Sequence, residues 1–205
     1  MTRIRSTLAR RCVRAQLTSV AAAIAALSAV SCGPSVEPPD VKLNPAPKQR
    51  YEITVTIDDP PSEISAVSGR IQYDIENDLC VPIADPIAGV RKYTSFTQPV
   101  RFRREGNNRY IGDVYADQLK NENYYGLGVC RWRITGVDAD IDIRGSKQHA
   151  ALDGTFVINQ ELQINLCRRA YASPASDSCM TYVKGINDAE KDVSYSVIIS
   201  SRRIF

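Results

Sequence analysis

From Tyr51 onward, apolar and polar side chains alternate along short runs of the sequence. In the run YEITVTID, apolar Tyr51, Ile53, Val55 and Ile57 take every second position, which is the period of a strand with one buried face. Similar runs follow in GRIQYDI, PVRFRREGNNRYIGDVYAD and GVCRWRITGVDADIDI, and turn-forming residues separate them. We therefore expect residues 51–205 to form an antiparallel β-sandwich, immunoglobulin-like or similar, with seven to eight strands and little helix.

Local patterns refine this expectation. Residues 105–108 are predicted to form the loop of a hairpin. The best helical signal is NDAEKD, where Asn187 and Glu190 have the spacing of a capping box. A strand rather than a helix is expected for a later set of apolar residues that share one parity: Phe156, Ile158, Leu162, Ile164 and Leu166.

Four of the six cysteines lie in the expected β-domain. An even number in an exported chain predicts two disulfides, with three possible connectivities. The short spacing favours pairing Cys167 with Cys179, which leaves Cys80 with Cys130 by elimination. No two of these cysteines have the close spacing of zinc ligands, so neither a metal nor another cofactor is expected.

Residues 1–31 have the composition of a secretory signal peptide. They contain five arginines, no acidic residue, and an apolar run of fourteen residues from Leu17 to Val30, which is short for a membrane span. The pair Arg10–Arg11 leaves both Sec and twin-arginine export open. Removing the five arginines leaves 21 basic and 23 acidic side chains, a formal net charge of −2, so nucleic acid is not an expected partner.

The tetrapeptide Ala29-Val30-Ser31-Cys32 resembles the lipobox of bacterial lipoproteins. The resemblance implies that Cys32 is lipidated, palmitate included, and becomes the new N-terminus. Gly33 after the cysteine implies the periplasmic face of the outer membrane of a Gram-negative bacterium. Ordinary signal peptidase is the alternative, and it would leave Cys32 as a free thiol. Residues 32–50, with five prolines after Cys32, are expected to be a semi-rigid tether.

Residue types used in catalysis are scarce. His149 is the one histidine, and its polar surroundings predict a solvent-facing loop. The run Asp138, Asp140 and Asp142 is not followed by the glycine and glutamate that an EF-hand loop requires. Strand alternation instead places the three carboxylates on one solvent-exposed face. The sequence therefore predicts a protein that is not an enzyme.

Arginines and tyrosines supply the candidate binding residues. Arg101 with Arg103, and Arg131 with Arg133, have the outward parity of two strands. Solvation of a sheet face is the ordinary interpretation. The alternative is a basic stripe, which together with Tyr124 and Tyr125 would suit an anionic protein surface or envelope polymer, because tyrosine and arginine are favoured at interface centres.

Three classes of function follow from compartment and architecture. The first is a lipid-anchored periplasmic protein-binding module without catalytic activity. One version of it is an inhibitor or immunity protein that acts against an envelope-targeting enzyme. The second is a structural accessory lipoprotein of an envelope or secretion assembly, where edge strands pair with partner subunits. An envelope hydrolase is the third.

Overall fold

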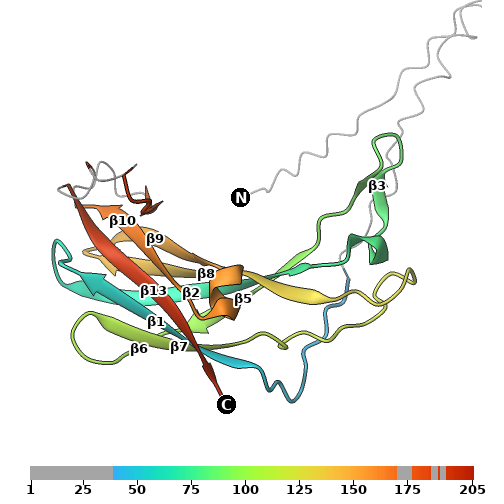
Figure 1. Ribbon diagram of the computed structural model, residues 1–205, viewed down its shortest axis with the longest axis horizontal. Coiled ribbons are helices and arrows are strands. Elements are labelled where there is room, and N and C mark those ends of the chain that lie inside the picture. The colour runs from blue at the N-terminus through green and yellow to red at the C-terminus, as the bar shows by residue number, and fades with distance from the viewer. Residues whose placement is uncertain (1–38, 170–176, 186–188, 190–192) are drawn as a thin grey trace, which may run out of the picture. The chain divides into compact units, whose positions relative to one another are not determined.

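Two β-sheets packed face to face form most of the described chain (Figure 1). The computed structural model describes residues 39–169, 177–185, 189 and 193–205. The expected signal peptide, Cys32 and most of the segment NDAEKD lie outside these residues. The described chain is all-β with two disulfides, as the alternation and cysteine count predicted.

Neighbouring strands are antiparallel in both sheets, except for the pair β9 and β11. The six-stranded sheet has the order β12 (Met180–Thr181), β10 (Leu162–Arg168), β13 (Ser194–Ile204), β1 (Arg50–Asp58), β7 (Arg109–Tyr115) and β6 (Arg103–Arg104). The five-stranded sheet has the order β11 (Asp177–Ser178), β9 (Ser146–Asp153), β8 (Trp132–Ile143), β2 (Ile64–Ile75) and β5 (Ser95–Arg101). A separate hairpin pairs β3 (Ile83–Asp85) with β4 (Val90–Arg91).

The expected seven or eight strands correspond to the eight strands that have seven residues or more. The other five described strands have two or three residues each. Strands of that length are too short to show alternation, so the sequence pattern does not reveal them.

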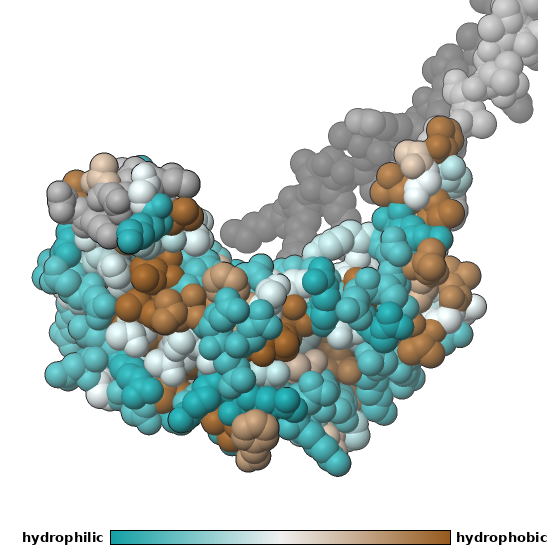
Figure 2. Space-filling model, in the orientation of Figure 1, coloured by the Kyte–Doolittle hydropathy of each residue, from teal (hydrophilic) through white to brown (hydrophobic). Residues whose placement is uncertain are grey.

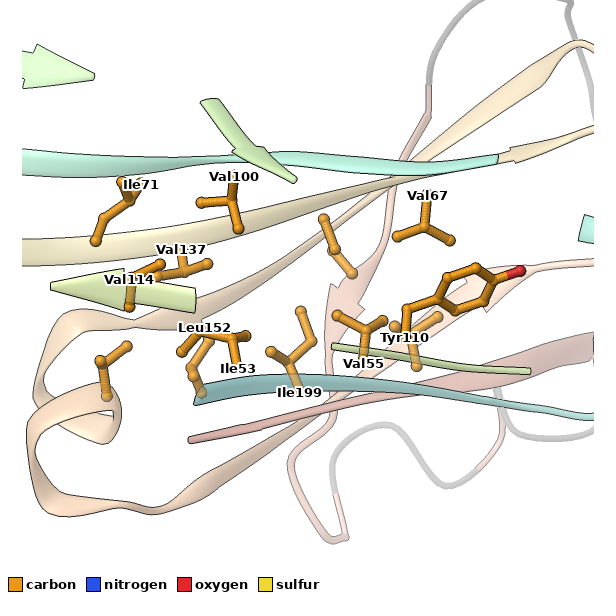
Figure 3. Close-up of a cluster of buried hydrophobic side chains, with 14 of the residues drawn as sticks. Ile53, Val55, Val67, Ile71, Val100, Tyr110, Val114, Val137, Leu152 and Ile199 are labelled. Carbon is orange, nitrogen blue, oxygen red and sulfur yellow. The ribbon is translucent and has the colours of Figure 1, made fainter. Parts of the chain in front are cut away.

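The hydrophobic core lies between the two sheets (Figure 3). Ile53, Val55 and Ile199 point into it from the six-stranded sheet, and Ile71 and Val137 from the five-stranded sheet. This arrangement confirms the inward parity expected for the YEITVTID run, whose four apolar side chains are all buried.

The alternation of buried and exposed side chains along strand β8 is interrupted in the middle of the strand. Ile134 and Val137 are both buried, although they are three residues apart. The pairing of β2 with β8 shifts register between Gln72 and Tyr73, which face Gly136 and Ile134. This β-bulge lets one strand keep apolar residues inward on both sides of the irregularity.

Two segments of the chain pass from one sheet to the other. β5 pairs with β2 in the five-stranded sheet, and the chain then turns at Phe102 so that β6 pairs with β7 in the six-stranded sheet. At the opposite edge, β11 pairs with β9 and β12 pairs with β10. The Cys167–Cys179 disulfide fixes this second crossing to β10. Both ends of each sheet are therefore occupied by short crossing segments, which limits the exposed edges.

The prediction of a strand through Phe156 and Ile158 is wrong, because these residues lie in helix α1 (Gly154–Asn159). The Asp153 carboxylate caps the helix by accepting a hydrogen bond from the Thr155 N–H at 2.7 Å. The helix buries Gly154 and Val157, which have helical spacing. The rest of the expected run, from Leu162 to Leu166, does form strand β10.

The two disulfides are the pairs that the spacing favoured, Cys80–Cys130 and Cys167–Cys179. Cys80 belongs to a single 3₁₀ turn, η1 (Asp78–Cys80), and bonds to the chain just before β8. This disulfide packs in a small cluster of its own with Val81, apart from the main core. It therefore differs from the disulfide of immunoglobulin domains, which joins the two sheets across the core.

Residues 39–49, here called the N-terminal segment, lie against the domain. The Asp117 carboxylate accepts hydrogen bonds from the N–H groups of Lys48 and Gln49 at 2.9 Å each. Lys42 pairs with Glu122 at 2.7 Å. The described part of the expected tether, residues 39–49, is thus held to the fold. Among the residues that the structure describes, no helix has the length and apolar character needed to cross a membrane.

Candidate functional site

The arginines predicted to form one basic stripe are divided among separate places. Along β2, Arg101 lies opposite Ser68 and Arg133 opposite Asp74, so about 20 Å of strand separates them. Arg103 lies in the other sheet and approaches Asp113 at 3.8 Å. The geometry does not bring these side chains together in a stripe.

Tyr124, Tyr125 and Arg131 lie close to the Cys80–Cys130 disulfide. Tyr124 packs edge-on against Trp132, with ring centroids 6.0 Å apart, and donates a hydrogen bond to the Lys120 carbonyl. Tyr125 packs against the disulfide cluster. Arg131 pairs with Glu76 at 3.4 Å. Both tyrosines are half-buried, so much of their surface already packs within the domain.

His149 lies in strand β9 and not in a loop as predicted. Its Nδ1 is 2.7 Å from Asp140 Oδ1, and its Nε2 is 3.7 Å from Asp138 Oδ1. Arg70 approaches the other Asp138 oxygen at 3.4 Å. The expected wet face of alternating aspartates is therefore present on β8, and His149 lies between two of its carboxylates. In this position the imidazole ring has a carboxylate oxygen near each of its two nitrogens.

Within the described ranges, no group of three or more His, Cys, Asp or Glu side chains is arranged to hold a metal ion.

An apolar projection at one end of the sandwich is the largest concentration of exposed apolar side chains. It consists of residues 77–93 and 123–130, which include the β3–β4 hairpin. Of the fourteen exposed large apolar side chains among the described residues, seven belong to it. Figure 2 shows apolar residues gathered at this end, around the hairpin labelled β3 in Figure 1. The seven are Leu79, Ile83, Ile87, Val90, Tyr93, Leu127 and Val129.

Covalent and polar contacts hold the two parts of the projection together. The Cys80–Cys130 disulfide joins them. Asn77 donates from Nδ2 to the Val129 carbonyl at 2.8 Å and accepts from the Arg131 N–H at 2.7 Å. Tyr93 at the end of the hairpin donates to the Asp74 carboxylate at 2.5 Å, and this hydrogen bond raises the pKa of Tyr93. The exposed apolar side chains are therefore presented by an ordered framework.

The outer face of the six-stranded sheet has an uncharged centre. Along one row across the strands, Ile164 of β10 lies opposite Ile198 of β13, which lies opposite Thr56 of β1. In the next row, Leu162, Ser200 and Thr54 are aligned in the same way. Leu162 is 55% exposed, and the two isoleucines are half-buried. We call these six residues the six-strand face; Figure 2 shows apolar residues gathered over β10 and β13.

Charged residues that neutralise one another in pairs border the six-strand face on two sides. Arg202 donates to Glu52 at 2.8 Å beyond the Leu162 row. On the β7 side, Arg50 pairs with Asp113 at 2.9 Å, and Arg109 with Glu105 at 3.3 Å. The face therefore has an uncharged, partly apolar centre and a polar rim.

Neither surface was identified from the sequence. The segment DLCVPIADPIAGV is apolar and rich in proline but has no period-two alternation, and this combination is the signal that could have indicated an exposed apolar loop. Nothing in the order of residues indicates that β10, β13 and β1 lie side by side, because they come from distant parts of the chain.

Comparison of the chain with models of known protein families, with curated proteins and with solved structures found no match.

Proposed function

We propose that the chain is a lipid-anchored protein of the Gram-negative cell envelope that acts as a protein-binding module without catalytic activity. It is placed on the periplasmic face of the outer membrane through a lipid on Cys32. Its binding surface is the six-strand face. One form of this function is inhibition of an enzyme that attacks the envelope.

The observation that supports this proposal is the uncharged centre of the six-strand face, which paired charged residues border on two sides. Protein interfaces are depleted of charged residues at the centre, and the rim around that centre is polar and solvent-accessible. The rim here has Arg50, Arg109 and Arg202, each paired with a carboxylate. Ile198 projects from β13, which is hydrogen-bonded on both sides, so a partner would meet a surface that needs little ordering on binding.

The experiment begins with the tagged, lipidated protein, purified from cell envelopes together with whatever protein it retains. The retained partner is then purified and titrated against variants of the full chain. Leu162→Arg and Ile198→Arg put an uncompensated charge at the centre of the face, and we expect each to weaken binding by about tenfold or more, which is about 1.4 kcal/mol.

Leu43→Arg is the matched control, because Leu43 is 48% exposed and lies on the N-terminal segment. This variant should bind like the unmodified protein. A partner that binds all three variants equally would contradict the proposed surface.

The kind of partner and its ratio to the protein distinguish the two binding roles, inhibitor and accessory subunit. A soluble enzyme that binds one to one and loses its activity would identify an inhibitor. Co-purification with a membrane complex would identify an accessory subunit. Turnover by the chain itself that disappears in His149→Ala would contradict a binding role without catalysis.

A further inference from the structure

We propose that the apolar projection contacts the lipid bilayer and acts as a second membrane attachment beside the lipid on Cys32. This inference depends on the lipid anchor of the proposed function. It assigns the projection to lipid, whereas the six-strand face is left for the protein partner.

The N-terminal segment brings Pro39, the first described residue after the expected anchor, to the same end of the domain as the projection. The Lys120 N–H donates to the Lys42 carbonyl, and the Cys130 N–H donates to the Glu122 carbonyl. The chain running back from Lys42 toward Pro39 therefore approaches the base of the 123–130 loop. An open pocket of about 430 Å³ is lined by Pro39 and Val41 together with Tyr93 and Phe96, which confirms that this segment reaches the base of the hairpin.

The length of the remaining chain limits how far the domain can be from the membrane. Seven residue steps connect Cys32 with Pro39, and an extended chain spans at most about 3.6 Å per residue. Pro39 is therefore within about 25 Å of a lipidated Cys32. Tyr93 lines the same pocket as Pro39, and the hairpin tip at Ile87 is six residues from Tyr93 along the chain. The bilayer surface is therefore within reach of the tip.

The hairpin tip combines exposed apolar side chains with satisfied polar groups. Ile87 is 100% exposed and Val90 is 55% exposed. The Asp85 carboxylate accepts hydrogen bonds from the N–H groups of Ile87 and Ala88 at 2.9 and 3.1 Å. Backbone groups that leave water for the hydrocarbon region of a bilayer need partners within the protein, and the carboxylate provides an acceptor for two N–H groups at this turn.

The Val81 carbonyl near the start of the hairpin also has a partner within the protein, because Arg91 Nη1 donates a hydrogen bond to it at 2.6 Å. Tyr93, at the base of the hairpin, is 71% exposed. Tyrosines are enriched at the level of the lipid headgroups. Apolar side chains buried at the membrane interface add to the binding free energy that the acyl anchor supplies.

The test uses the lipidated full-length protein, bound to vesicles of phosphatidylethanolamine and phosphatidylglycerol with no other protein. Cys32 is blocked by its lipid and the described cysteines form disulfides, so Ile87→Cys introduces a thiol for an environment-sensitive fluorophore. Phe205→Cys is the matched control, because Phe205 is also fully exposed but lies at the C-terminus. Doxyl-labelled lipids then report contact between the fluorophore and the acyl chains.

We expect the fluorophore at position 87 to shift to shorter wavelength and to be quenched by the doxyl lipids, while the fluorophore at position 205 changes in neither respect. A fluorophore at position 87 that remains in water on protein-coated vesicles would overturn the inference. A shift without doxyl quenching would indicate contact between copies of the protein and would also overturn it.

Failure of the anchor is detected separately. A protein that carries no palmitate label and does not float with vesicles would overturn the lipid anchor and, with it, this inference. A labelled protein that floats, but whose Ile87 probe stays in water, would overturn only the assignment of the projection to lipid.

Discussion

Replacement of Gly154 by alanine tests the close contact between α1 and β8. A Cβ atom at this position would lie 2.2 Å from the carbonyl oxygen of Ile134 and 2.6 Å from its carbonyl carbon. Ordinary contacts of a Cβ begin near 3.4 Å, so helix and strand would have to separate by about 1 Å. β8 is hydrogen-bonded to β2 and β9 and cannot move independently of them.

We expect Gly154→Ala to destabilise the protein by about 3 kcal/mol, at the upper end of the usual range for overpacking. In a domain of this size, such a loss lowers the melting temperature by about 6–12 °C. Thermal unfolding followed by far-ultraviolet circular dichroism measures this shift, and urea unfolding gives the free energy.

Gly136→Ala is the control for that measurement. Gly136 lies opposite Asp153, next to the start of α1, but its added Cβ would come no closer than 3.7 Å to another residue. Alanine there should leave stability unchanged or raise it by about 0.4–1 kcal/mol. If both variants melt within a degree of the unmodified protein, the close approach of α1 to β8 is wrong.

Three further measurements test other contacts. Removing the Cys80–Cys130 disulfide with alanine at both positions frees a 50-residue loop, so urea unfolding should show a loss of about 4 kcal/mol; a loss below about 1 kcal/mol would contradict the chain-entropy estimate. Burial raises the pKa of Tyr73, so the unfolded chain ionises first and stability should fall as pH rises above about 10. Tyr73→Phe should flatten that alkaline slope, while losing the 2.7 Å hydrogen bond to the Tyr115 carbonyl; an unchanged slope would exclude Tyr73 as its source. Asp117→Ala removes the acceptor for two backbone N–H groups of the N-terminal segment, which should exchange hydrogen faster, whereas unchanged exchange would show that other contacts hold the segment.

The sequence predicted those strands in which every second side chain faces the hydrophobic core. Tyr51 to Ile57 shows why, because each apolar side chain in that run meets the same core and each polar one meets water. The disulfides were also predictable, since only short spacing was needed to choose Cys167 with Cys179. Phe156 and Ile158 were misassigned because their spacing of two residues is that of a strand face. The helix instead buries Gly154 and Val157, three residues apart, and leaves Ile158 44% exposed. The Asp153 cap and the close approach of Gly154 to β8 favour the helix.

The candidate site depended on distances that the sequence does not contain. Arg101 and Arg133 have the same outward parity, yet strand pairing separates them along β2. His149 appeared to lie in a polar loop because only pairing with β8 brings its ring between Asp138 and Asp140.

Alternation, cysteine count and the Ala29-Val30-Ser31-Cys32 tetrapeptide by themselves determined an all-β fold, two disulfides and the expectation of an anchored, exported chain. Local side-chain order carries this information, because inward or outward orientation on a strand depends only on position along it. The tertiary structure decided which residues form surfaces. Ile164 and Ile198 meet on one face, and Leu79 and Leu127 lie on one projection, because long-range strand pairing and the Cys80–Cys130 disulfide bring distant segments together.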